Sequence, residues 1–193
     1  MPGPGMHNGS AVDESMNLSM SAKGLPLYEA VVAFVRDEVD PVTEEFFRLG
    51  EGRADHWGYG EGQLELLDSL KAKAKAAGLW NFFLPNAETG EGLSNLDYAY
   101  IAAELGKNPL ASECLNCSAP DTGNMEVLER VGTPEQKERW LKPLLAGEIR
   151  SAFAMTEPDV ASSDAKNIST TAVLDGDEWI INGEKYYISG AGD

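Results

Sequence analysis

The sequence is poor in the residues on which several common kinds of active site depend. Its 193 residues include two cysteines, two histidines and 15 basic side chains against 32 carboxylates, and the formal net charge is −17. Because nucleic-acid binding requires clustered Lys and Arg to neutralise phosphates, this composition argues against a nucleic-acid partner. No apolar run approaches the roughly 18 residues that span a bilayer, so we expect no membrane span.

Motifs for nucleophilic catalysis and for nucleotide binding are also missing. The sequence contains neither the G-x-S-x-G of a nucleophile elbow nor a G-x-x-x-x-G-K-[ST] phosphate loop. His7 and His56 have no candidate nucleophile nearby in sequence, which disfavours a histidine-dependent triad. The carboxylates are numerous, but nothing in the sequence pairs two of them for acid–base catalysis.

The two cysteines, Cys114 and Cys117, form a single C-x-x-C pair. A zinc site would need two further ligands, and only His7 and His56 are available as histidine ligands. A thioredoxin-like redox pair should follow a strand, but residues 108–113 have no strand pattern. We therefore interpret the pair as helix packing and expect no metal site.

The first 24 residues are rich in Gly, Pro, Ser, Met and Asn, which predicts a disordered leader over 1–24. Residues 1–21 lack the basic and apolar regions of a secretory signal and the arginines of a mitochondrial presequence. We therefore expect reduced thiols and a cytoplasmic location in a bacterium. A mitochondrial or peroxisomal location stays open for a eukaryotic source.

Helical periodicity dominates residues 25–149. Apolar residues recur at spacings of three and four, which is typical of one buried helix face. Thr133 and Gln136 form a capping box with Pro134 at the first helical position, and Pro143 is expected to kink or end that helix. Residues 50–62 are Gly-rich but follow no strand, so we predict a loop there. The five predicted helices lie near residues 28–42, 64–77, 96–105, 125–131 and 134–145.

From residue 150 onward, short β-branched and aromatic segments alternate with turn signals. Asp175-Gly176 and Asn182-Gly183 favour tight hairpin turns. So few strands cannot close a barrel, so a truncated domain or a partner chain is expected. The predicted fold class is α+β: an N-terminal all-α helical bundle domain over 25–149, then the first strands of an incomplete β-barrel domain over 150–193. The predicted meander comprises Thr170–Leu174, Glu178–Ile181 and Lys185–Ser189.

A further apolar strand is predicted to start at Phe153 and to break at Glu157-Pro158, because Pro158 has no amide hydrogen. The residues after it are small and rich in hydroxyl groups. A strand end that opens into such a loop offers backbone N–H groups and serine hydroxyls to a ligand with carbonyls, ring nitrogens and phosphates. The residues alone favour a turn that caps itself with Ser and Asp.

Longer motifs favour the ligand interpretation. The segment Phe153–Ser162, with its Met-Thr-Glu-Pro core, and the segment Tyr187-Ile188-Ser189 resemble the two flavin-contact segments of the acyl-CoA dehydrogenase family. Residues 132–144 resemble the approach of that family to its β domain. Residues 114–126 and 156–165 are similar to the subgroup of family members ten and eleven. The resemblance covers roughly residues 25–193, which corresponds to an N-terminal domain and part of a middle domain.

The resemblance implies an FAD cofactor lying against the segments that begin at Phe153 and Lys185. Thr156 and Ser189 would offer hydroxyls to the polar edge of the flavin ring, and main-chain groups of Met155 and Thr156 would bond its pyrimidine end. Tyr187 would cover one ring face. Ser162, with Ser163 beside it, would contact the pyrophosphate or the acyl-CoA. The full set of cofactor-binding candidates is Phe153, Met155, Thr156, Ala161, Ser162, Ser163, Tyr187, Ile188 and Ser189, with Ser162 also a candidate for substrate binding.

The same resemblance implies α,β-dehydrogenation of an acyl-CoA thioester, with an electron-transfer flavoprotein as electron acceptor and a homodimer or homotetramer as the assembly. The family's catalytic base comes from a C-terminal helical domain, so we name no catalytic residue in this chain and expect the chain alone to be inactive. Three alternatives stay open: a catalytically silent flavin- or acyl-CoA-binding module, a flavoenzyme similar to acyl-CoA oxidases or nitroalkane oxidases, and a helical interaction domain without flavin.

Overall fold

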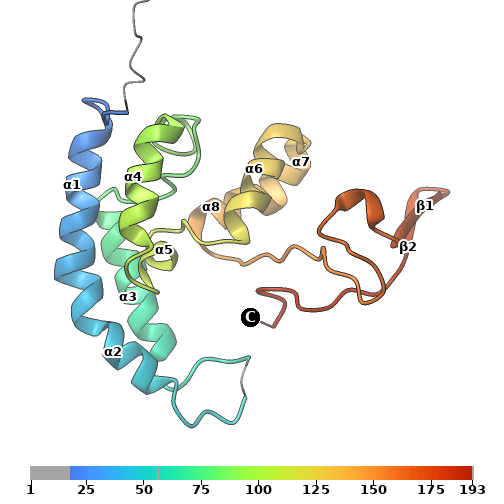
Figure 1. Cartoon of the computed structure of the whole chain (residues 1–193), viewed down its shortest axis with the longest axis horizontal. Helices are drawn as coiled ribbons and strands as arrows, with labels where there is room; N and C mark the ends of the chain where they lie inside the picture. Colours follow the sequence, from blue (N-terminus) through green and yellow to red (C-terminus); the bar gives the residue numbers. More distant parts are fainter. Residues whose placement is uncertain (1–17, 56, 193) are drawn as a thin grey trace, which may run out of the picture.

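The computed structural model describes residues 18–192 apart from residue 56. These residues form a helical part, which contains α1 to α8, and a smaller β part after it (Figure 1). Within this range no helix is long and apolar enough to cross a bilayer. The elements, in chain order, are α1 (Gly24–Phe34), the π-helical segment η1 (Val35–Val39), α2 (Asp40–Leu49), α3 (Gln63–Ala76), α4 (Asn95–Leu105), α5 (Ala111–Cys114), α6 (Asp121–Val131), α7 (Pro134–Gln136), the π-helical segment η2 (Lys137–Leu141), α8 (Lys142–Ala146), the 3₁₀ turn η3 (Ala165–Asn167), β1 (Thr171–Asp175) and β2 (Glu178–Asn182).

Two prolines determine the shape of the first and last predicted helices. A π-helical segment precedes Pro41 in one and Pro143 in the other, and each proline is the second residue of the α-helix that follows. A proline cannot donate to the carbonyl four residues back and its ring clashes with that carbonyl, so a widened turn relieves both problems. Pro143 therefore interrupts the regular hydrogen bonding as predicted, but the helix continues to Ala146 and ends at Gly147 with φ of 68°.

The remaining helix boundaries follow local signals. The predicted capping box is confirmed, because Thr133 accepts from the Gln136 amide while the Gln136 side chain accepts from the Thr133 amide. Gly78, with φ of 70°, and Gly132 follow α3 and α6 as expected. The short helix α5 was not predicted, since four residues are too few to show a helical period.

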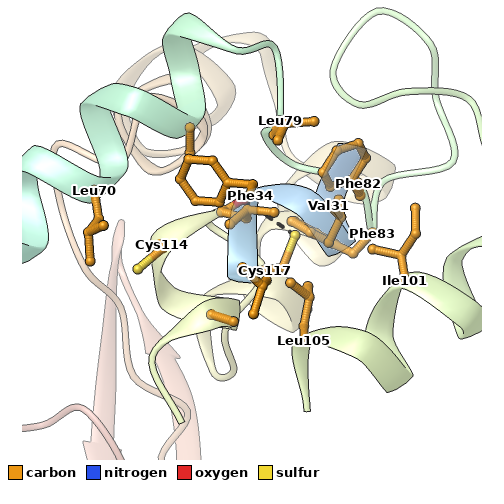
Figure 2. Packing of buried hydrophobic residues seen from close by; sticks show 14 of the residues in the cluster. Val31, Phe34, Leu70, Leu79, Phe82, Phe83, Ile101, Leu105, Cys114 and Cys117 are labelled. Atoms are coloured by element: carbon orange, nitrogen blue, oxygen red, sulfur yellow. Dashed lines mark hydrogen bonds between the residues drawn. The ribbon is translucent and has the colours of Figure 1, made fainter. Parts of the chain in front are cut away.

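The helices bury one continuous apolar core, part of which is drawn in Figure 2. Phe82, Leu67 and Ile101 are almost completely shielded from water, and burying one such side chain contributes about 1.5–3 kcal/mol. Cys114 and Cys117 belong to this core as free thiols, which confirms helix packing. Burial raises the pKa of the Cys114 thiol to about 12 and that of Cys117 to about 11. Neither thiol is therefore activated for redox chemistry or metal binding.

The predicted leader over 1–24 falls largely on residues 1–17, which lie outside the described part. Residues 18–23 run onto α4, where the Asp97 carboxylate accepts from the Ser21 amide at 2.7 Å and from its hydroxyl at 2.9 Å. The hydrogen bond from the Ser21 amide is the main reason why the pKa of Asp97 lies below its usual range. The helical part thus begins at Gly24, with the preceding residues fastened to it.

The β part contains one antiparallel hairpin, β1–β2, in which Thr171 pairs with Asn182 and Asp175 with Glu178. This confirms the hairpin predicted at Asp175-Gly176, and Gly176 has φ of 65° as such a turn requires. The predictions of strands beginning at Phe153 and at Lys185 are wrong, since the described residues form only a two-stranded sheet. The reason is that these two segments share too few backbone hydrogen bonds to make a ladder.

Candidate functional site

Two segments are predicted to bind a ligand, the first beginning at Phe153 and the second at Lys185. They lie side by side although neither is a strand. The Tyr186 amide donates to the Thr156 carbonyl at 3.1 Å. Gly190 lies against Ser151, because a Cβ atom at Gly190 would be 3.0 Å from the Ser151 carbonyl oxygen. The two contacts give an antiparallel course, and Figure 1 shows the orange segment leaving the helices toward the β part and the red segment returning from it. Tyr187–Ser189 therefore lies alongside residues 151–156.

The carboxylate of Glu157 holds this arrangement together. It is buried, and it accepts hydrogen bonds from the Ser169 amide at 2.7 Å, the Ser169 hydroxyl at 2.6 Å and the Thr170 amide at 2.9 Å. The Lys185 ammonium adds a contact at 2.9 Å. The Ser169 hydroxyl, then Thr170 and Lys185, lower the pKa of Glu157 far below its ordinary value of 4.5. The carboxylate thus connects the first segment to Ser169 and Thr170, which directly precede β1, and to Lys185 at the start of the second segment.

Ser162 is also buried, and its hydroxyl accepts from the Glu157 amide at 2.8 Å. This bond closes the loop after Pro158 on itself, as a self-capped turn would. Ala161 and Ser163, on either side, are exposed. Of the hydroxyls in this loop, Ser163 is the one that a solvent-side phosphate could reach, whereas Ser162 serves the loop.

The remaining predicted residues keep exposed or half-buried surface. Phe153 is 58% exposed and Tyr187 is 87% exposed, while Thr156 is half-buried. The carbonyls of Met155 and Thr156 are already occupied by the Lys185 ammonium and the Tyr186 amide. Among the described residues, none accepts a hydrogen bond from the Thr156 amide or hydroxyl. Thr156 therefore offers donors rather than acceptors to a ligand.

A cavity of about 840 Å³ opens along the second segment, lined by Trp57, Lys185, Tyr186, Tyr187, Ile188, Ser189, Ala191 and Gly192. The rings of Tyr186 and Tyr187 meet at 4.4 Å between centroids with a tilt of 34°. Tyr187 has φ of 54°, a left-handed conformation that is rare for an aromatic residue and that is found more often at functional sites than elsewhere. The cavity unites the predicted residues Tyr187, Ile188 and Ser189 with Trp57, which the sequence did not indicate.

A second hollow of about 460 Å³ adjoins the first segment and is mainly apolar. It is lined by Ala119, Pro120, Thr122, Gly123, Asn124, Val127 and Phe153. It lies beside the larger cavity, since a Cβ atom at Gly190 would be 3.6 Å from Pro120. Phe153 thus faces an apolar space bounded by the start of α6.

A polar cluster fixes the first segment to the helices. The buried Asp121 carboxylate accepts from the Ser151 amide at 2.7 Å and its hydroxyl at 2.6 Å, and it pairs with Arg150 at 2.9 Å. Arg150 also pairs with Glu113, and Asn124 donates to Ser151 at 2.8 Å. These contacts set the direction in which the chain leaves α8 toward Phe153. Sequence patterns do not indicate these contacts, because the partners come from α5, α6 and the segment after α8.

Two family models match the chain, the acyl-CoA dehydrogenase N-terminal domain over residues 25–148 and the acyl-CoA dehydrogenase middle domain over residues 152–193. Among curated proteins, mouse acyl-CoA dehydrogenase family member 10 is 50% identical over 85% of this chain and 15% of its own length. Human family member 11 is 48% identical over 89% of this chain and 21% of its own length. FadE2 of Mycobacterium tuberculosis, assigned as an acyl-CoA dehydrogenase, is 47% identical over 92% and 42%. The chain therefore spans less than half the length of these relatives.

Solved structures with a similar fold also come from acyl-CoA dehydrogenases. A protein from Mycobacterium abscessus assigned as an acyl-CoA dehydrogenase superposes with a TM-score of 0.79 and 52% identity, covering 89% of this chain and 43% of that one. An acyl-CoA dehydrogenase from Bacillus anthracis, solved in complex with FAD, gives a TM-score of 0.61 and 25% identity over 88% of this chain and 27% of its own.

Proposed function

Because the chain belongs to the acyl-CoA dehydrogenase family, we propose that it supplies the flavin-binding groove of an enzyme that removes hydrogen from the α and β carbons of an acyl-CoA thioester. The observation that supports this most directly is the pairing of residues 151–156 with Tyr187–Ser189 beside a cavity of about 840 Å³. FAD would supply the acceptor of the β-hydride, and the protein supplies binding and orientation.

The residues of the groove fit a flavin ring. The free amide and hydroxyl of Thr156 match the acceptor atoms along the polar edge of such a ring, and Ser189 adds an exposed hydroxyl. The exposed ring of Tyr187 would cover one flavin face, with its left-handed backbone turning the ring outward from the segment. Lys185 and Glu157 hold these groups in place and carry no proton in the reaction.

The residues that would contact the substrate and the phosphates are proposed from which side chains and hollows are open to solvent. The apolar hollow beside Phe153 would take an acyl chain, because it presents few polar groups that would be left unpaired. Exposed Ser163 is the better candidate for a hydroxyl contact with pyrophosphate or coenzyme A, while Ser162 shapes the loop through Glu157. An electron-transfer flavoprotein as acceptor and a homodimer or homotetramer as assembly belong to the same proposal.

The test is FAD binding by the purified chain, followed by the change in the visible flavin spectrum and by equilibrium dialysis. Thr156→Ala removes the hydroxyl and keeps the amide, and it should weaken binding up to about tenfold, the usual effect of losing one ligand hydrogen bond. Thr171→Ala, at an exposed position of β1, is the matched control and should bind as the unaltered chain does. No FAD binding by the unaltered chain, or equal binding by both variants, would contradict the proposal.

A second candidate function is a flavin-dependent oxidase, as the family resemblance also allows. The groove would serve either reaction, and the exposed Tyr187 and the open cavity give dioxygen a route to a ring bound there. The rate at which dioxygen reoxidises the reduced, protein-bound flavin separates the two. Slow reoxidation supports the dehydrogenase, and rapid reoxidation with hydrogen peroxide formation supports the oxidase.

A further inference from the structure

Trp57 lies on the loop between α2 and α3, yet it lines the cavity formed by Lys185–Gly192. The two segments are far apart in sequence and touch directly, because a Cβ atom at Gly192 would be 2.5 Å from Trp57 Cε3. Figure 1 shows this loop reaching toward the C-terminal end of the chain. The helical part therefore contributes an aromatic wall to a groove otherwise built by the β part.

The loop that carries Trp57 is anchored on both sides of this residue. The Asp55 carboxylate accepts from the Trp57 amide at 2.9 Å. Near α3, buried Gln63 accepts from the Gly60 amide at 2.9 Å and donates to the Phe46 carbonyl at 3.1 Å. Gly60 must be a glycine, since a Cβ atom there would be 1.9 Å from a backbone carbonyl oxygen. These contacts hold the described parts of the loop, while 70% of Trp57 stays exposed.

The cavity has the chemistry of a site for a planar aromatic ring. Trp57, Tyr186 and Tyr187 line it, and Trp57 and Tyr187 both keep most of their surface exposed. Lys185 is the one charged lining residue, and its ammonium is already bound to Glu157 and to the Met155 carbonyl. An anionic group would find no free cation among the lining residues. The volume, about 840 Å³, lies within the range of pockets that hold small ligands.

We infer that Trp57 is a specificity-determining residue that selects a planar heteroaromatic ring by stacking in this cavity. The inference rests on the proposed function, because the cavity is the proposed flavin groove, and it adds a contact from the helical part. Such a ring could be an isoalloxazine or an adenine, since FAD contains both and coenzyme A contains the second. Base–aromatic and aromatic–aromatic contacts of this kind change affinity by a factor of about ten.

The experiment measures the affinity of the purified chain for riboflavin, which carries only the isoalloxazine, and for ADP, which carries only the adenine. Trp57→Ala should weaken binding of one of these probes about tenfold, and Trp57→Phe should weaken it only two- to threefold because a ring remains. Trp179→Ala is the control, since Trp179 is 63% exposed on β2 and lies outside the cavity. Tryptophan emission should be quenched by the bound ring in the unaltered chain, and less in Trp57→Phe.

The outcomes distinguish a failure of the inference about Trp57 from a failure of the proposed flavin groove. If the unaltered chain binds riboflavin and Trp57→Ala binds both probes equally well, the inference is wrong and the flavin groove stands. If the unaltered chain binds neither probe, the inference is wrong, and binding of whole FAD by the unaltered chain decides separately whether the flavin groove stands. Weakening of riboflavin binding alone identifies the isoalloxazine as the ring at Trp57, and weakening of ADP binding alone identifies the adenine. Circular dichroism confirms folding of each variant, and Trp57→Phe decides the question should Trp57→Ala not fold.

Discussion

The ammonium of Lys185 lies 2.9 Å from the buried carboxylate of Glu157, and this contact joins the two segments of the proposed flavin groove. The same ammonium donates to the Met155 carbonyl at 2.9 Å. Met155 and Glu157 flank Thr156, the residue proposed to contact the flavin edge. The position of Thr156 thus depends on a charge pair to which its own side chain does not belong.

Glu157→Gln should loosen the groove. The amide keeps one acceptor and the shape of the side chain, but it leaves the Lys185 ammonium without its anionic partner. We expect the Ser169 and Thr170 amides, which donate to Glu157, to exchange their hydrogens at least about tenfold faster. Glu178→Gln, on the exposed hairpin, is the control and should leave both amides protected. Unchanged protection in Glu157→Gln would show that the hairpin entry is held by other contacts.

The stability of the groove should also depend on pH, because Glu157 titrates. Hydrogen bonds hold the folded pKa of this carboxyl well below its ordinary value of 4.5, so the ionised form favours the folded state. The contribution is complete above pH 4.5 and is lost as the pH falls below that value toward the folded pKa. Protection of the Ser169 and Thr170 amides, corrected for intrinsic exchange, should therefore decline in acid. The same measurement on Glu157→Gln should give a flat profile, and an equal decline in both proteins would assign the effect to another group.

Asp121→Ala should destabilise the junction between the helical part and the first segment. It leaves the Ser151 amide and the Arg150 guanidinium without their shared acceptor. Unsatisfied groups of this kind cost about 1–3 kcal/mol of unfolding free energy, measured by urea denaturation. Asp159→Ala, at an exposed position, should change it by less than about 0.5 kcal/mol. A change in unfolding free energy as small for Asp121→Ala as for Asp159→Ala would mean that the cluster adds no stability.

Cys114 and Cys117 should react with a thiol reagent only after unfolding. Burial raises their pKa to about 12 and about 11, from an ordinary value of 9.0, so at pH 8 almost no thiolate forms in the folded chain. We expect labelling by an aromatic disulfide to be at least about a hundredfold slower in the folded chain than in urea. Fast labelling of the native chain would contradict the assignment of both residues to the core.

Local chemistry was sufficient to predict some elements and insufficient for others. The hairpin turn at Asp175-Gly176 and the capping box at Thr133 each involve residues only a few positions apart, so the sequence contains all the relevant partners. The strand predicted at Phe153 failed because strand formation needs a neighbour along its whole length, and the paired segment supplies one backbone bond at Thr156. Apolar character marked the segment correctly but could not supply its neighbour.

The sequence alone determined the family and the order of a helical part and a β part, and it indicated the two segments that we propose bind a flavin. The tertiary structure decided what each side chain in those segments does. It buried Ser162 within its own loop, gave Glu157 partners at Ser169, Thr170 and Lys185, and brought Trp57 to the cavity. Motifs and caps depend on neighbours along the chain, whereas these contacts join residues that only packing brings together.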